Sequence, residues 1–349
     1  MTGRDGGGWG CPVPEGRYGR VTMAHGGGGT LTDGLLHGAL GALLPKGKGA
    51  LGDAAWVDCG GTQVAVTTDG FVVRPMEFPG GDIATLAVNG TVNDLAVAGA
   101  RPVAITAGWV LEEGVEMSVV ERLAKRMRAA ADAAGVEIAA GDTKVVERGG
   151  GEPGAILNTT GVGVLAEGLP EPLRPERIRE GDTVIVTGSI GRHGVAVMAS
   201  RTGLSFEGLT SDCAPLAEAM LDLYRSGIEV HGARDATRSG LGGILCELSR
   251  ARGLGMLCQE GRIPVHGDVR AACELMGLDP LFVANEGCAA VFVPPEQAEA
   301  AVETLRRHEA CREAASVGRV TGEDVLMATE LGTVRRIYPP SGELLPRIC

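Results

Sequence analysis

The feature that most constrains the fold of this chain is an alternation of strand-like and helix-like segments on both sides of a proline-rich stretch. That stretch holds Pro170, Pro172 and Pro175 among charged residues, which is typical of a rigid linker between domains. Alternating strands and helices favour sheets that are covered by helices. Because 349 residues are also many for one ordinary core, we predict an α/β (α+β) fold with two domains.

The first half is predicted to fold as one α/β unit. A helix is predicted over residues 82–98, where apolar residues recur at helical spacing. A second helix is expected to begin with a capping box at Ser118 and to end at Gly135. Residues 141–144 are predicted to form a loop after a strand. The strands of this unit are predicted over residues 63–69, 102–110, 136–140 and 155–164.

The second half repeats the order of elements. Strands are predicted over residues 182–186 and 289–293, and a loop over 187–194 is expected to open a helix. Further helices are predicted over residues 214–224, 241–249 and 295–308. The expected organisation is a Gly-rich N-terminal segment (1–50), an N-terminal domain (51–168), a C-terminal domain (176–337) and a flexible tail (338–349).

Composition excludes several classes of partner. A net charge of -12 and an aromatic content of 3% argue against binding to a nucleic-acid backbone or stacking on its bases. No apolar run reaches the roughly 18 residues of a membrane span, and the first residues do not resemble a signal peptide. The nine cysteines include no CxxC pair, so they do not describe a disulfide framework. We expect a protein of the reducing cytoplasm.

Four aspartates are candidates for a metal site. Asp69 follows a strand, Asp94 lies on the helix behind it, Asp142 precedes Lys144, and Asp53 lies in a small-residue loop. Taken singly, an aspartate at such a position is more often a cap or turn residue. Taken together, carboxylates that converge would repel one another unless a hard cation such as Mg²⁺ lay between them. The set is therefore predicted to hold a magnesium–nucleotide triphosphate.

Three further side chains have two open interpretations each. Lys144 is either a solvated surface lysine or a cation that stabilises charge on a reacting oxygen or phosphoryl group. Glu286, between Asn285 and Gly287, is either a residue at a strand entry or a base in a cleft. His193, in a Gly-flanked loop, is either a loop residue or a phosphate contact.

The chain ends on a cysteine, Cys349, after Pro346, Arg347 and Ile348. A thiolate is a nucleophile that can carry a group between active sites. The alternative interpretation is that the chain ends on a cysteine by chance and that its thiol carries no group.

Several of these segments together resemble the HypE family of hydrogenase-maturation carbamoyl dehydratases. The resemblance extends from about residue 25 to the end of the chain. The HypE family belongs to the superfamily of aminoimidazole ribonucleotide synthetase, selenophosphate synthetase and thiamine-monophosphate kinase. The segments that carry it are Thr67-Thr68-Asp69, Phe78-Pro79-Gly80-Gly81-Asp82, Asn93-Asp94, Leu111-Glu112-Glu113-Gly114, Gly141-Asp142-Thr143-Lys144-Val145-Val146, Arg234-Asp235-Ala236-Thr237, Ala284-Asn285-Glu286-Gly287 and Pro346-Arg347-Ile348-Cys349.

The resemblance implies an aminoimidazole ribonucleotide synthetase-like ATP-binding fold that forms a homodimer through its N-terminal sheets. It implies that a HypF-type carbamoyltransferase loads a carbamoyl group on Cys349. ATP would phosphorylate the amide oxygen, and loss of phosphate would give a thiocyanate. That cyanide would pass to iron in a HypC–HypD-type complex, for the nickel–iron hydrogenase centre.

The resemblance also implies roles for individual residues. Lys144 and Glu286 would act on the carboxamide, and His193 would lie near the phosphates. Asp53, Asp69, Asp94 and Asp142 would hold Mg²⁺, and these four with Thr68 and Thr143 would bind ATP.

Two departures and two rival functions belong with this resemblance. His25 precedes the Gly run where an acid is expected, and Ser239 replaces an expected glycine.

One rival is a small-molecule ATP-dependent kinase or synthetase of the same fold, in which Cys349 is idle. The other is a non-catalytic scaffold that presents Cys349 to metal-handling partners.

Overall fold

The computed structural model describes residues 20–27, 29–43 and 52–339. The carrier thiol predicted at Cys349 lies outside the described residues, as do parts of the predicted N-terminal segment and tail. None of the helices in the described part combines the length and the apolar character that a membrane span needs.

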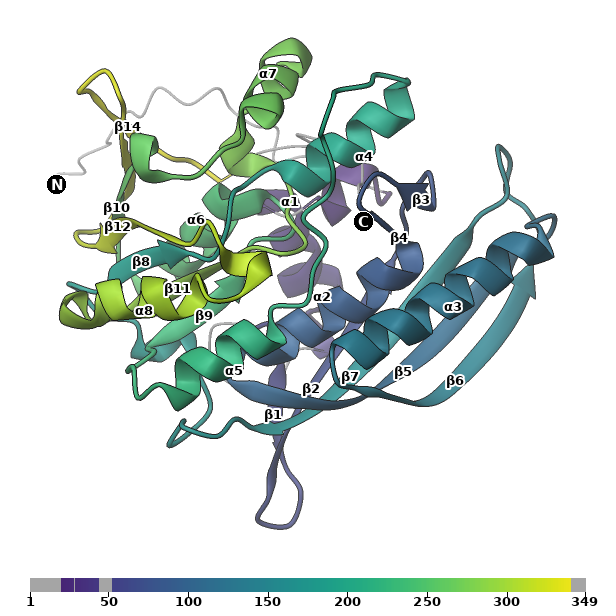
Figure 1. Cartoon of the computed structure of the whole chain (residues 1–349), viewed down its shortest axis with the longest axis horizontal. Coiled ribbons are helices and arrows are strands. Elements are labelled where there is room, and N and C mark those ends of the chain that lie inside the picture. The colour runs from purple at the N-terminus through teal and green to yellow at the C-terminus, as the bar shows by residue number, and fades with distance from the viewer. Residues whose placement is uncertain (1–19, 28, 44–51, 340–349) are drawn as a thin grey trace, which may run out of the picture.

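The first half forms a five-stranded sheet with α2 (Ile83–Val97) and α3 (Met117–Ala133) on one face (Figure 1). The strand order is β1-β2-β7-β5-β6, antiparallel except for the parallel pair β5–β6. The strands are β1 (Ala55–Asp58), β2 (Gln63–Phe71), β5 (Ala100–Glu112), β6 (Glu137–Val146) and β7 (Ala155–Leu165). A small hairpin of β3 (Glu77–Phe78) and β4 (Gly81–Asp82) precedes α2.

The second half forms a seven-stranded mixed sheet in the order β14-β13-β10-β12-β8-β11-β9. Its strands are β8 (Thr183–Val186), β9 (Gly232–Asp235), β10 (Met256–Gln259), β11 (Ala289–Val293), β12 (Ala315–Val320), β13 (Val325–Ala328) and β14 (Val334–Arg336). Its helices are α4 (Arg192–Thr202), α5 (Ala217–Arg225), α6 (Gly240–Arg252), α7 (Gly267–Met276) and α8 (Ala298–Leu305).

Short helical turns connect these elements and build the N-terminal segment. That segment contains α1 (Thr30–Gly34) and a π-turn, η2 (Leu35–Ala39). The 3-10 turns are η1 (Met23–Gly26), η3 (Gly41–Leu43), η4 (Pro175–Arg177), η5 (Glu260–Arg262), η6 (Pro280–Phe282), η7 (Pro295–Gln297) and η8 (Glu309–Cys311).

The predicted α/β class and most predicted elements are confirmed, with two corrections in the first half. The predicted loop over residues 141–144 is wrong, because β6 continues to Val146 and pairs with β5 along its length. The predicted capping box is also wrong. Helix α3 begins at Met117, and the Ser118 hydroxyl donates instead to the Glu116 carboxylate at 3.2 Å.

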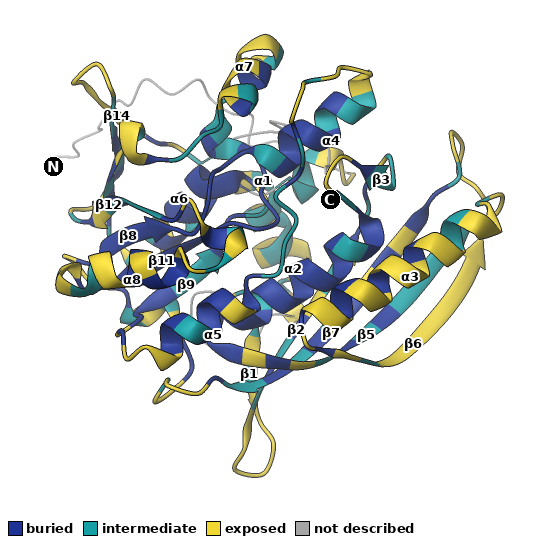
Figure 2. Ribbon diagram, in the orientation of Figure 1, coloured by how far each residue is buried: buried dark blue, intermediate teal, exposed yellow. Residues whose placement is uncertain are grey.

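Helix α2 lies between the two halves and is buried on nearly all sides (Figure 2). Its sequence is apolar or small all round, which is typical of a helix in the core of a large protein. It packs on the first sheet and also contacts α5 and β9 of the second half. The Tyr224 hydroxyl of α5 donates to the carbonyl of Ala96 at 2.7 Å. The position of α2 therefore couples the two halves.

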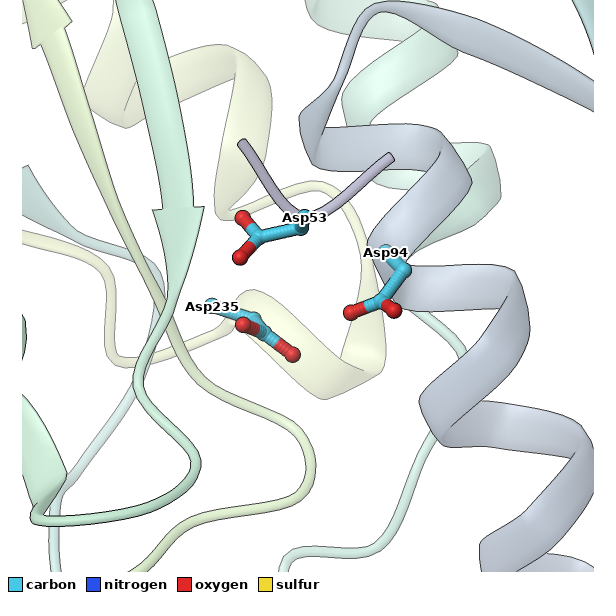
Figure 3. A group of neighbouring side chains, drawn as sticks. All are labelled: Asp53, Asp94 and Asp235. Carbon is cyan, nitrogen blue, oxygen red and sulfur yellow. The ribbon is translucent and has the colours of Figure 1, made fainter. Parts of the chain in front are cut away.

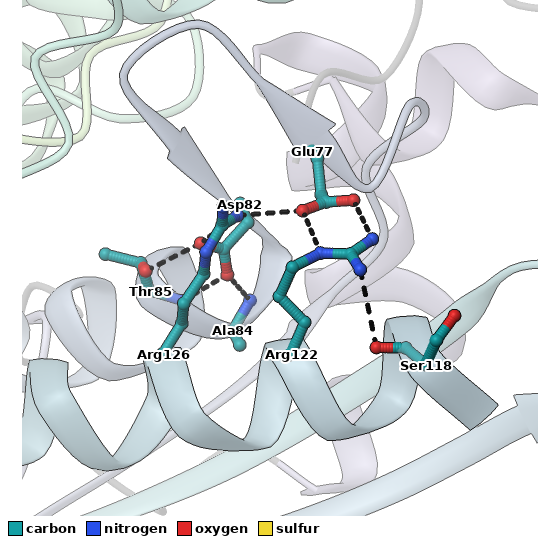
Figure 4. A network of polar contacts seen from close by, with 7 residues as sticks. All are labelled: Glu77, Asp82, Ala84, Thr85, Ser118, Arg122 and Arg126. Atoms are coloured by element: carbon teal, nitrogen blue, oxygen red, sulfur yellow. Dashed lines mark hydrogen bonds and ion pairs between the residues drawn. The ribbon is translucent and has the colours of Figure 1, made fainter. Parts of the chain in front are cut away.

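The start of α2 is held by a polar network (Figure 4). Asp82 caps the helix by accepting from the Ala84 and Thr85 amides at 2.9 and 3.0 Å. Beside it, Arg122 and Arg126 of α3 pair with the half-exposed Glu77 at 2.8 and 2.9 Å. These arginines lower the pKa of Glu77, chiefly through the hydrogen bond from Arg122.

We expect Asp82→Ala to lower the free energy of unfolding by about 1–2 kcal/mol, because it removes a buried N-cap. Glu77→Ala should cost no more than about 1 kcal/mol, since exposed ion pairs contribute little. Chemical denaturation of both variants measures the difference. An equal or larger loss for Glu77→Ala would contradict this account of the network.

Candidate active site

A cavity of ≈ 870 Å³ lies between the two halves and is lined by polar residues from both. The N-terminal half contributes Asp53, Asp69 and Asp94 to its wall, while the C-terminal half contributes Asp235 and Glu286. Residues of α1 and η2, including Asp33 and His37, close one side. An ion pair between Asp33 and Arg250 of α6 joins that side to the C-terminal half.

Three carboxylates converge in this cavity (Figure 3). Asp53 precedes β1, Asp94 lies on α2, and Asp235 ends β9. One oxygen from each lies within 4.8 Å of the others. Three segments that are far apart in the sequence therefore present their acids to one point.

Burial and mutual repulsion raise the pKa values of these acids. Removal from water is the largest cause for all three. The pKa values of Asp94 and Asp235 lie well above their usual range, and neighbouring carboxylates, including Asp69, raise them further. The pKa of Asp53 rises to about 6 although Arg234 lowers it.

Cationic and hydroxyl partners compensate for only part of this charge. Arg234 Nε lies 2.6 Å from Asp53 Oδ1, and its Nη2 lies 3.4 Å from Glu247. The Thr67 hydroxyl lies 2.7 Å from Asp94 Oδ2 and 2.9 Å from the Asp53 carbonyl, so it donates to one of them at a time. Convergent, charged oxygen ligands are what Mg²⁺ prefers. The donor set fits a divalent cation.

We expect the metal-free protein to lose stability as the pH rises from about 4 through 6. Acids whose pKa is raised in the folded state hold more protons there than in the unfolded chain, so their deprotonation favours unfolding. Mg²⁺ needs the deprotonated ligands, so its stabilising effect should be larger at pH 7 than at pH 5. Thermal melts with and without Mg²⁺ measure this, and a Mg²⁺ effect that is independent of pH would contradict it.

Glu286 lies on the wall of the same cavity. It belongs to the segment before β11, and it is 3% exposed. Across from it, Gly90 of α2 leaves room for Phe71, since a Cβ at Gly90 would lie 2.9 Å from the Phe71 ring and 3.8 Å from Glu286 Oε2. Helix α2 therefore approaches Glu286 closely through a residue without a side chain.

The structure brings together only some of the side chains predicted for the site. Those that line the cavity are Asp53, Thr68, Asp69, Asp94 and Glu286. Asp142, Thr143 and Lys144 do not line it, because they lie on the exposed edge strand β6. There, Lys144 Nζ pairs with Asp142 Oδ2 at 2.8 Å, and the two side chains are 66% and 69% exposed.

His193 does not line the cavity either. Its ring is fully buried in the first turn of α4, where Nδ1 lies 2.9 Å from the Ser211 hydroxyl. Phe78 contacts it edge-on, with ring centroids 5.3 Å apart. Burial lowers the pKa of His193 to about 3, so the ring is neutral. A phosphate contact by His193 stays a prediction.

The sequence-based set missed Asp235, the third member of the acidic cluster. The segment Arg234–Thr237 contributed to the family resemblance, but no role was assigned to it. The signal that could have found it is an acid within a segment that carries the resemblance. Arg234, which pairs with Asp53, lies in the same segment and was also missed.

The fold and cavity define this chain as an AIR synthase related protein. The model of the N-terminal domain of that family matches residues 51–165, and the model of its C-terminal domain matches residues 179–329.

Relatives that match nearly the full length of this chain identify a narrower family within the AIR synthase related proteins. "Carbamoyl dehydratase HypE" of Azotobacter vinelandii is 44% identical over 338 residues, which cover 95% of this chain and 98% of that protein. A solved HypE–HypF complex gives a TM-score of 0.81 at 40% identity, over 87% of this chain and 99% of that one. A HypE structure in complex with ATP gives a TM-score of 0.79 at 38% identity, over 94% and 100%.

The chain belongs to the HypE family of carbamoyl dehydratases, which are hydrogenase-maturation enzymes. Neither rival function, the small-molecule kinase or synthetase and the non-catalytic scaffold, agrees with this membership.

Proposed function

We propose that this chain dehydrates a carbamoyl group carried on the thiol of Cys349, using ATP, and leaves a thiocyanate on the sulfur. The cyanide would become a ligand of the active-site iron of a nickel–iron hydrogenase. The observation that carries the proposal is the acidic cluster of Asp53, Asp94 and Asp235 in one cavity with the buried Glu286. ATP binding is proposed from the related HypE structure that contains ATP.

The proposed reaction balances without an oxidant or reductant. The carbamoyl oxygen attacks the terminal phosphorus of ATP, and ADP leaves. The carbon–oxygen bond then breaks, and the oxygen departs with inorganic phosphate. Two protons leave the nitrogen while the carbon–nitrogen bond becomes triple. Phosphorylation is needed because a carboxamide oxygen is otherwise a poor leaving group.

The acids and threonines of the cavity would bind and orient the triphosphate. Mg²⁺, when bound, supplies positive charge to the phosphate oxygens. Asp53, Asp94 and Asp235 would hold it, while Asp69 adds negative charge beside them. Thr68 lies on the same wall as a hydrogen-bonding group for the nucleotide. Arg234 would keep Asp53 in place through their ion pair.

Glu286 would take a proton from the carboxamide nitrogen. A general base must stand close to its substrate, and a site without bulk water strengthens its effect. The 3% exposure of Glu286 and its place on the cavity wall meet these conditions. Its neighbour Asn285 is fully buried and donates from Nδ2 to the Ala236 carbonyl at 2.7 Å. That bond ties the Glu286 segment to the residue after Asp235.

We place Asp142, Thr143 and Lys144 in the site of a second copy of the chain. They lie on an edge strand, which is open to pairing with another chain. Apolar side chains are exposed on the same sheet, namely Val57, Val103, Val146 and Ile156. A homodimer through this sheet would bury them. It would also carry Lys144 towards the partner's cavity, where its charge would stabilise the reacting carboxamide and Asp142 and Thr143 would join the nucleotide site.

A mixing experiment tests the homodimer. Lys144→Ala and Asp94→Asn each inactivate a different half of a shared site, so mixed dimers regain one intact site. Activity should return when the two inactive variants are unfolded together and refolded. Recovery should be absent when either variant is refolded alone. No recovery in dimers that are shown to be mixed would contradict the shared site.

Two partners complete the proposed cycle. A HypF-type carbamoyltransferase would load Cys349, in line with the related HypE–HypF complex. A HypC–HypD-type complex would accept the cyanide on iron. The cycle needs a free thiol at Cys349, which suits a reducing cytoplasm.

Mass spectrometry of the C-terminal peptide tests the proposed function. After incubation with the carbamoyltransferase, carbamoyl phosphate and Mg-ATP, Cys349 should carry an adduct that has lost the mass of one water relative to the carbamoyl form. With a non-hydrolysable ATP analogue in the second step, only the carbamoyl form should appear. Loss of water without nucleotide, or on another cysteine, would contradict the proposal.

A further inference from the structure

Glu286 is held in place by a side chain from the other half of the molecule. Asn93 of α2 donates from Nδ2 to the Glu286 carbonyl at 3.3 Å and to the Ala214 carbonyl at 3.0 Å. Its Oδ1 accepts from the Leu216 amide at 2.7 Å. Asn93 is 2% exposed, so these bonds form without competition from water. One amide side chain therefore joins α2, the Glu286 segment and the segment 211–216 before α5.

The segment 211–216 holds Glu286 from a second direction. The Asp212 carboxylate accepts from the amides of Glu286 and Gly287 at 3.2 and 3.1 Å. A Cβ at Gly287 would lie 2.0 Å from the Asp212 carbonyl, so the two segments are in direct contact. Asp212 therefore holds the backbone that carries Glu286.

Asn93 adjoins Asp94, which belongs to the acidic cluster. Adjacent residues of one rigid helix turn thus reach the proposed metal site and the proposed base. We propose that Asn93 is a positioning residue that fixes Glu286 relative to the acidic cluster across the boundary between the two halves. This inference rests on the role of Glu286 as the base in the proposed function.

Asn89 provides a matched comparison on the same helix. It lies one turn before Asn93 and is also 2% exposed. Its Nδ2 lies 3.5 Å from the sulfur of Cys213, so it contacts the same segment. No hydrogen bond from Asn89 to Glu286 is present among the described residues. If a buried amide on α2 served only the stability of the fold, replacing either asparagine would have the same effect on the dehydration rate.

The test compares Asn93→Ala with Asn89→Ala in single-turnover dehydration of the carbamoylated full-length chain. Asn93→Ala should lower the rate by roughly 10- to 100-fold, because small misplacements of a catalytic group carry costs of this size. ATP affinity, measured by calorimetry, should stay close to that of the parent chain. Asn89→Ala should keep the parent rate. Equal rate losses for both variants would overturn the inference.

A double variant separates positioning from general destabilisation. If Asn93 acts through Glu286, Asn93→Ala should cost nothing further in a Glu286→Gln background, since residues that act as a unit are not additive. If the rate losses of the two single variants instead multiply in the double variant, the inference is overturned. If Asn93→Ala does not fold, Asn93→Asp replaces it, since it keeps the shape and the acceptor for Leu216 but lacks both donated bonds. A Glu286→Gln variant at the parent rate would instead refute the role of Glu286 as the base in the proposed function.

Discussion

Replacement of Glu286 by glutamine is expected to lower the rate of thiocyanate formation by roughly 10²- to 10⁴-fold, the usual contribution of a general base. The amide keeps the size of the side chain but cannot accept the proton of the carboxamide nitrogen. Because Glu286 lines the same cavity but does not belong to the acidic cluster, Mg-ATP binding should persist. Quenched-flow kinetics on carbamoylated protein, with mass spectrometry as the readout, measures the loss.

The control for this prediction is Glu229→Gln. Glu229 is half-exposed, pairs with Arg179 at 2.8 Å and does not line the cavity. It should leave the rate unchanged. If Glu286→Gln instead weakened Mg-ATP binding and left the rate at saturating ATP intact, Glu286 would belong to the nucleotide site, and its role as a base would be wrong.

Asp235→Asn is expected to have opposite effects on activity and on stability. Loss of one of three converging charges should lower Mg-ATP turnover by about 100-fold or more. Loss of a residue that only supports a metal ligand costs about 10- to 100-fold in metal affinity or activity, and loss of the ligand itself should cost at least as much. The same change removes a buried acid whose pKa is raised by burial and by Asp53. The metal-free variant should therefore melt at a higher temperature than the parent chain at pH 7.

The control for Asp235→Asn is Asp132→Asn on the exposed face of α3, where the carboxylate is 67% exposed and pairs with Arg128. It should change neither activity nor melting temperature. ATPase assays and calorimetric melts in the presence of a chelator measure both effects. A metal-free Asp235→Asn protein less stable than the parent would mean that Asp235 serves structure, not cation binding.

The sequence predicted those parts of the site that depend on local pattern. Asp69 and Asp94 stand on a strand and on a helix whose periodicity was clear, and both line the cavity. The position of Glu286 before the apolar run of β11, which the structure confirms as a strand, left two interpretations open, and only the family resemblance implied a role on the carboxamide. In these cases the local pattern fixes the element, and the element places the side chain.

Other parts depend on pairing between distant segments and were not predictable in this way. The sequence predicts Asp142 and Lys144 in a loop after a strand, but parallel pairing with β5 extends the strand through Val146. Asp235 joins Asp53 and Asp94 only because β9 packs beside α2. The short strands β10, β13 and β14 carry too few residues for a visible alternation.

The fate of the carbamoyl oxygen tests the central claim most directly, which is that this cavity uses ATP to remove that oxygen from a group on Cys349. The chain would be carbamoylated with carbamoyl phosphate labelled with oxygen-18 at its carbonyl and then given Mg-ATP for a single turnover. The account predicts that the label leaves Cys349 and appears in inorganic phosphate, in proportion to the thiocyanate formed. Label found in water, or retained on the protein while ATP is consumed, would contradict it.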